Sequence, residues 1–126
     1  MKLFRLLWCQ LTYCLLGIGY NVVSYLAVSG GKPPLSATLP IVGATSMTVY
    51  GLCLIPGFLR AHTAYRVLMG LCIVVFGYGG IIKHILNLTG SGLDLYSSST
   101  AWLFAVGINV FGLVLNILAA SGKYEK

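Results

Sequence analysis

Charged residues are scarce in this sequence, and carboxylates are the scarcest of them. Only 8% of the 126 residues are charged, with two Asp and Glu in total, whereas 58% are hydrophobic. A typical soluble domain carries about 25% charged residues. A water-facing surface cannot be covered with so few charges, so we expect lipid to cover most of this protein.

The two carboxylates also stand far apart in the chain. Asp94 falls in an expected loop and Glu125 near the C-terminus, on opposite sides of the predicted membrane. This placement excludes paired-carboxylate catalysis within one chain. Small proton-coupled drug exporters have a similar length, but their mechanism needs an acid inside a helix, and this sequence has none.

Metal-ligand and disulfide patterns are missing as well. The chain has four cysteines, all within apolar runs and without metal-ligand spacing, and we interpret them as small buried residues; they are Cys9, Cys14, Cys53 and Cys72. His62 and His84 are 22 residues apart, about 33 Å along a helix. One chain cannot bring both to a single metal ion, so no metal site is predicted.

Long apolar runs are what the sequence does contain. A spanning helix needs about 20 mostly apolar residues, and four stretches qualify. They predict one domain, an all-α integral membrane protein with four transmembrane helices at about 3–28, 39–59, 67–88 and 101–120. Pro56 and Gly57 are expected to break or kink the end of the second helix. Ser99 or Thr100 is expected to cap the fourth, with Trp102 at the membrane interface.

The basic residues predict an orientation. Six of the eight Lys and Arg fall at the termini or between the second and third helices, which is one side of a four-span protein; they are Lys2, Arg5, Arg60, Arg66, Lys123 and Lys126. By the positive-inside rule both termini are expected in the cytoplasm or its equivalent, in a bacterial inner or organellar inner membrane. Because these charges lie in short clusters between apolar runs, the net charge of +6 indicates topology rather than nucleic-acid binding.

Small and polar residues recur at helical spacing and predict which faces point into protein. The first helix carries Gln10, Cys14, Gly17, Asn21 and Ser24 on one face, and the fourth carries Ala105, Asn109, Gly112, Asn116 and Ala120. In the third helix Gly70, Gly77 and His84 are seven residues apart. Such stripes hold membrane helices together. An alternative is that the Asn residues and His84 line a polar cavity or hold a headgroup.

Lys83 and His84 are the candidate contacts for a bound molecule. In one interpretation they form an interfacial pair, with Lys83 reaching toward lipid headgroups. In another, His84 is an axial ligand of a haem or chlorophyll. No cofactor is specified by a motif, although a bound lipid, quinone, carotenoid or chlorophyll is compatible with the many aromatic residues.

The absence of catalytic groups and buried charge favours a non-catalytic function. The first hypothesis is an accessory or assembly subunit of a respiratory, photosynthetic or membrane-oxygenase complex, with other integral membrane subunits and lipids as partners. The second is a small homo-oligomeric transporter or channel, with Asn21, Asn109 and Asn116 along the path. The third is a lipid-, quinone- or pigment-binding subunit that uses His84.

Overall fold

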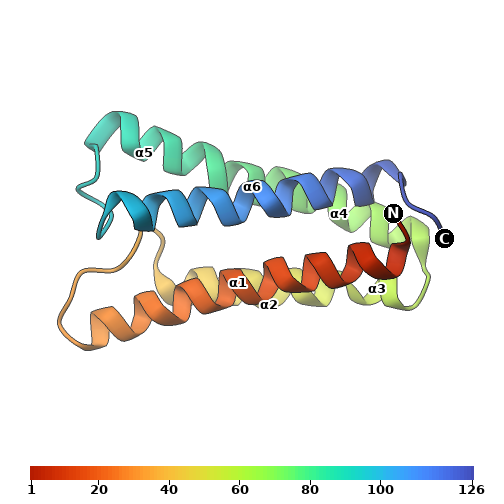
Figure 1. Cartoon of the computed structure of the whole chain (residues 1–126), viewed down its shortest axis with the longest axis horizontal. Helices are drawn as coiled ribbons and strands as arrows, with labels where there is room; N and C mark the ends of the chain where they lie inside the picture. The colour runs from red at the N-terminus through yellow and green to blue at the C-terminus, as the bar shows by residue number, and fades with distance from the viewer.

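The computed structural model of the chain describes residues 1–126 as helices without strands (Figure 1). The elements are α1 (Leu3–Ser29), α2 (Pro40–Cys53), the short α3 (Ile55–Phe58), α4 (His62–Gly77), the π-helical turn η1 (Tyr78–Ile82), α5 (Lys83–Ser91) and α6 (Ser99–Ser121). Because α3 continues α2, and η1 and α5 continue α4, they form four rods. All four are long and apolar enough to cross a membrane, which confirms the four helices expected from the sequence.

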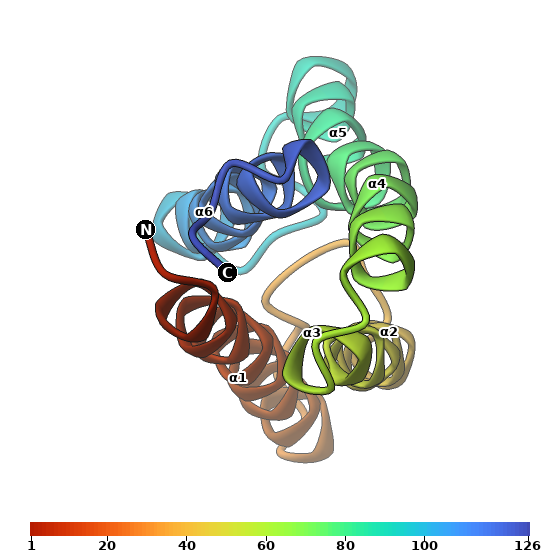
Figure 2. The same ribbon diagram turned by 90° about the vertical axis from the view of Figure 1, so that its right-hand side faces the viewer.

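The rods form two helical hairpins that meet along one side. α1 packs along α2, α4 packs along α6, and α1 also contacts α6. Figure 2 shows the rods around a common centre, with α1 and α4 at opposite corners. α2 contacts α4 but makes no backbone contact with η1 or α5. The hairpins are therefore apart at the end that carries the α1–α2 loop (Figure 1).

Large apolar side chains cover the outside of the bundle. Leu39 and Val74 are each 69% exposed and Phe104 is 60% exposed, whereas Gln10 and Asn116 are buried. A soluble protein buries its large apolar residues and keeps unpaired polar ones outside. Here large apolar side chains lie outside the bundle as well as in its core, an arrangement compatible with surrounding lipid.

Two helix boundaries differ from the sequence prediction. The third rod begins at His62, five residues before the predicted start at 67, because hydropathy locates the apolar part of a helix and not its polar first turn. Arg60, in the left-handed region with φ 58°, makes the tight turn before it. The α6 cap is Ser98, whose side chain accepts a hydrogen bond from Ala101 N at 3.1 Å. The expectation of Ser99 or Thr100 was therefore one or two residues late.

The break predicted at the end of the second helix is present. α2 ends at Cys53, a turn at Leu54 follows, and Pro56 occupies the first turn of α3. Proline is tolerated there because the first helical residues need no intrahelical partner for their N–H groups. The bend brings Gly57 against Leu7 and Tyr65, which leaves no room for a side chain at residue 57.

The two ends of the chain pair at the same end of the bundle (Figure 1). Leu3 N donates to Glu125 O at 2.8 Å, and Glu125 N donates to Met1 O at 2.9 Å. Arg66 of α4 lies beside them and donates through Nε to Ala120 O at 3.0 Å. This contact satisfies a carbonyl that the end of α6 leaves unpaired. We call this the terminal end, and the end with the α1–α2 loop the loop end.

Candidate ligand-binding cavity

A cluster of buried polar side chains joins all four rods near the terminal end. We call it the inner polar cluster; it consists of Gln10, Tyr50, Tyr65, Met69 and Asn116. Gln10 is its centre. Its Nε2 lies 3.1 Å from both Asn116 Oδ1 and Met69 Sδ, and its Oε1 accepts a hydrogen bond from the Tyr65 hydroxyl. Tyr50 OH donates to Asn116 Oδ1 at 2.7 Å.

The cluster leaves little free polar capacity. Gln10, Tyr50 and Tyr65 are fully buried, and in the whole chain Asn116 Nδ2 is the one buried side-chain nitrogen or oxygen without a partner. Hydrogen bonds between membrane helices are worth about 0.6 to 2 kcal/mol each. The cluster therefore fixes the register of the rods and closes the bundle toward the terminal end.

An aromatic layer lies on the loop-end side of this cluster. The rings of Tyr13, Tyr50 and Phe76 meet edge to face, with centroids 4.9, 5.5 and 6.5 Å apart. Tyr13 OH donates to Asn109 Oδ1 at 3.0 Å, which links α1 to α6. These groups separate the inner polar cluster from the space beyond it.

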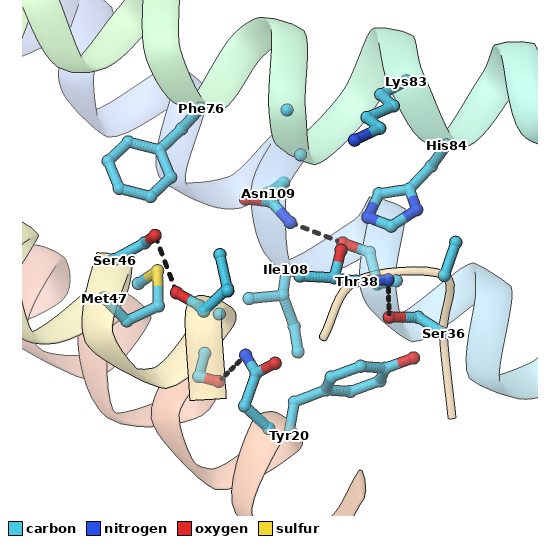
Figure 3. Close-up of a pocket in the computed structure, with 18 of the residues that line it drawn as sticks. Tyr20, Ser36, Thr38, Ser46, Met47, Phe76, Lys83, His84, Ile108 and Asn109 are labelled. Carbon is cyan, nitrogen blue, oxygen red and sulfur yellow. Dashed lines mark hydrogen bonds between the residues drawn. The ribbon is translucent and has the colours of Figure 1, made fainter. Parts of the chain in front are cut away.

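That space is a cavity of about 360 Å³ in the loop-end half of the bundle, shown in Figure 3. α1, α2, η1, α6 and the α1–α2 loop all contribute to its wall. Its apolar side includes Met47, Phe76 and Ile108, and its polar side includes Ser36, Thr38, Lys83, His84 and Asn109. The volume is near the lower end of the range for small-molecule sites, about 300 to 1,000 Å³.

The cavity persists at this place because glycines and a divergence of helices keep it open. Gly79 of η1 lines it, and a Cβ there would meet no atom within 4 Å. The missing contact between α2 and η1 leaves a seam beside it. Exposed Val42 of α2 and Val75 of α4 line the cavity along this seam. The opening therefore faces sideways, where lipid would lie.

Two asparagines predicted to face protein do so, but each bonds its own helix. Asn21 Nδ2 donates to Gly17 O, and Asn109 Nδ2 donates to Ala105 O, both at 2.8 Å. Each also lies against a glycine of another rod, Asn21 against Gly43 and Asn109 against Gly80, where a Cβ would overlap the amide. Asn21 and Asn109 both line the cavity, whereas Asn116 belongs to the inner polar cluster.

His84 stands at the cavity wall with its orientation held by three neighbours. Its Nδ1 lies 2.6 Å from Tyr96 OH, and Asn87 Nδ2 donates to the same hydroxyl oxygen at 3.4 Å. The indole Nε1 of Trp102 donates to the His84 backbone carbonyl at 3.0 Å. The residue is buried except where it borders the cavity, and its Nε2 has no hydrogen-bond partner in the protein.

The residues predicted to lie on helix-packing faces fall into two groups. Buried within the bundle are Gln10, Gly17, Asn21, Ser24, Ala105, Gly112 and Asn116. Gly70 and Gly77 lie apart from them: a Cβ on Gly70 would meet nothing within 4 Å, and one on Gly77 only Leu113 at 4.0 Å. The seven-residue stripe does not extend to His84 because the wider turn of η1 rotates the residues that follow it.

Sequence reasoning missed several members of these sites, among them Tyr65, Tyr96 and Phe76. Tyr65 and Tyr96 lie outside or at the edge of the predicted spans, yet both are buried and hydrogen-bonded. Phe76 gave no signal because one phenylalanine among many apolar residues is ordinary. A buried tyrosine hydroxyl needs a hydrogen-bond partner. The one available clue was therefore that Gln10 and His84 could each pair with a tyrosine from another part of the chain.

Comparisons of the chain with protein-family models, with curated proteins and with solved structures gave no match. The geometry of the cavity is therefore the basis on which a function can be inferred.

Proposed function

We propose that this protein spans a membrane four times, with both termini in the cytoplasm or its equivalent. Lys2, Arg66 and Lys123 lie at or beside the terminal end, where Leu3 pairs with Glu125. Clustered Lys and Arg in short segments stay on the cytoplasmic side. The loop end, and with it the cavity, would then face the outer leaflet of a bacterial inner membrane or the corresponding leaflet of an organelle.

Its function is to hold an amphiphilic membrane molecule, as a non-catalytic accessory subunit of a larger membrane complex. The observation that carries this proposal is the cavity of about 360 Å³, with polar and apolar sides and an opening along a helix seam. A quinone ring, a lipid headgroup or a stretch of acyl chain suits that volume. A whole chlorophyll or carotenoid is too large for that volume.

The surface of the bundle supports membership of a complex. Gly107 of α6 is exposed, lies in a shallow apolar groove with Leu16, Phe104 and Phe111, and a Cβ there would meet no atom. Small residues on membrane helices allow another helix to approach closely. A neighbouring subunit helix at this groove would bury surface that this chain leaves bare.

Filling the cavity tests the binding function. The Gly79→Leu variant places a side chain in the open space, whereas Gly70→Leu adds the same group to the same rod away from the cavity. Protein purified in mild detergent should retain an extractable amphiphile, identified by mass spectrometry. The amphiphile should be lost in Gly79→Leu and kept in Gly70→Leu. Equal retention in both variants would contradict the proposal.

Native purification tests the accessory-subunit proposal separately. Gentle extraction from the natural membrane should yield this protein together with other integral membrane subunits in constant ratio. Gly107→Leu should release it from them while leaving its own fold unchanged. A protein that leaves the membrane as a stable, active monomer would contradict complex membership without affecting the cavity.

A small homo-oligomeric transporter is the second candidate, and one observation favours it. The cavity lies in one half of the bundle, and the aromatic layer and the inner polar cluster close the other half. Access from one side at a time is what a transporter requires. Flux into proteoliposomes containing only this protein would support transport, and Asn109→Leu should then reduce it.

A further inference from the structure

Two adjacent side chains bring hydrogen-bond donors to the polar side of the cavity. Lys83 and His84 both line it, and Figure 3 shows both side chains directed toward its interior from the same helix. Lys83 carries three donors and no acceptor. Within the chain it forms neither a hydrogen bond nor a salt bridge. Its charge is therefore available to something that enters the cavity.

The hydrogen bonds around Tyr96 determine what His84 offers. Asn87 Nδ2 is a donor, so the Tyr96 oxygen accepts from it, and the Tyr96 O–H has His84 Nδ1 as its one acceptor nearby. Neutral imidazole has one donor and one acceptor nitrogen. With Nδ1 accepting, the proton is on Nε2. In this tautomer, which the donor Asn87 favours, His84 presents an N–H to the cavity.

The chain supplies no anion to match these donors. Its two carboxylates are Asp94 in the outer loop and Glu125 at the terminal end, and neither lines the cavity. The exposed Lys83 and the buried His84 thus bring an ammonium and an N–H to a cavity without a carboxylate, and such donors complement a group rich in acceptors. Charge-assisted hydrogen bonds of this kind are about twice as strong as neutral ones.

We propose that the cavity recognises an oxyanion, a phosphate or carboxylate, that is bound by Lys83 Nζ and the His84 Nε2–H as the head of an amphiphile. This inference rests on the proposed binding function and gives the ligand its chemical class. The depth of His84 in the membrane suits a charged head. Trp102 donates a hydrogen bond to the backbone of His84, and Trp is favoured at the membrane interface. An anionic head at this level remains close to water.

The seam between α2 and η1 gives the apolar part of the same molecule a way out. Val42 and Val75 line the cavity and are 54% and 60% exposed, so they border both the cavity and the lipid. No backbone contact crosses the seam between α2 and η1. An acyl chain can leave through it while the head remains at Lys83, so the ligand enters sideways from the outer leaflet.

The test compares lipids that differ in charge. Purified, delipidated protein is titrated in detergent with phosphatidylglycerol or phosphatidylcholine, and binding is read by native mass spectrometry. Wild-type protein should prefer phosphatidylglycerol. Lys83→Met, which keeps the length of the side chain, should reduce that preference about tenfold, as expected for a hydrogen bond to a charged group. Lys32→Met, which removes a charge from the same end of the molecule, should leave it unchanged.

Failure of this inference differs from failure of the binding function. If Lys83→Met and wild type show the same lipid preference while Gly79→Leu abolishes binding, the cavity holds an amphiphile but does not recognise an oxyanion. If Gly79→Leu binds both lipids like wild type, the cavity function itself is wrong. His84→Gln retains an N–H donor at about the same reach from the backbone and should keep a larger share of the preference than His84→Leu.

Inorganic phosphate distinguishes the source of the oxyanion. Added alone at millimolar concentration, phosphate should fail to displace phosphatidylglycerol if the acyl chain contributes to binding through the seam. Displacement that depends on Lys83 would show that the cavity takes a free anion instead, with the recognition by Lys83 and His84 unchanged. Displacement that is equal in Lys83→Met would contradict recognition at this site.

Discussion

The ring of Tyr13 lies directly against the backbone of Gly112. A Cβ on that glycine would overlap Tyr13 Cζ, well inside the contact distance of two carbon atoms. The close approach places the Tyr13 hydroxyl 3.0 Å from Asn109 Oδ1, one turn along the same helix. The absence of a side chain at Gly112 thus allows Tyr13 to join the aromatic layer, of which Phe76 lines the cavity.

Replacement of this glycine is the first prediction. Gly112→Ala should lower the free energy of unfolding by about 1 to 3 kcal/mol, the usual effect of overpacking, because the tyrosine ring cannot move without breaking its hydrogen bond. Unfolding in mixed micelles of mild detergent and SDS measures the change. Gly107→Ala, on an open part of the same helix, should be neutral. Equal loss in both variants would show that helix flexibility, and not the ring contact, is responsible.

The second prediction concerns the centre of the inner polar cluster. Gln10→Leu has nearly the same volume but leaves the Tyr65 hydroxyl without its acceptor and Asn116 without one of its two donors. Stability should fall by about 1 to 3 kcal/mol, the cost of unsatisfied buried groups. Thr12→Val is the control, since Thr12 is exposed and bonds only Trp8 O of its own helix. A Gln10→Leu protein as stable as wild type would mean that the cluster aligns the helices but does not add to the free energy of unfolding.

The third prediction separates neighbouring serines at the start of α6. Ser98→Ala should cost about 1 kcal/mol, because it removes the side chain that caps Ala101 N. Ser99→Ala should cost little, since Ser99 is already the first helical residue. The same unfolding assay measures both. A larger effect at Ser99 would contradict the cap.

The fourth prediction tests orientation. In a variant without its natural cysteines, Ser91→Cys should react with an impermeant maleimide in intact cells. Ser121→Cys should react only after the membrane is permeabilised. The reason is the accumulation of Lys and Arg at the terminal end. Labelling of Ser121→Cys from outside would reverse the proposed orientation and move the cavity to the cytoplasmic leaflet.

The sequence allowed the four helices and the inward faces of α1 and α6 to be predicted, because both depend on periodic spacing. The residues from Gln10 to Ser24 and from Ala105 to Asn116 follow the turns of uninterrupted α-helices. The same reasoning failed for the third rod. The number of residues per turn changes at η1, so Gly70 and Gly77 do not share the face of His84. A prediction based only on helical periodicity cannot detect the π-helical turn at Tyr78–Ile82.

The cavity could not be predicted for a different reason. Its wall combines four rods and a loop, and its volume depends on how far α2 lies from η1. That separation is a property of the packed hairpins and has no local sequence pattern. Lys83 and His84 were identified as candidates, but the role of Tyr96 in orienting the imidazole depends on a contact between the α5–α6 loop and α5.

The pairing of Leu3 with Glu125 has a consequence for how the protein is made. Residue 125 is synthesised after all four rods, so the first helix spends the whole of translation without its final partner. Gln10 makes its three side-chain hydrogen bonds with α4 and α6, so all of them are unmade in the α1–α2 hairpin alone, and the one to Asn116 forms only after α6 has been synthesised. The two ends of the chain thus complete the fold by pairing with each other. A tag fused to either end lies beside this pairing.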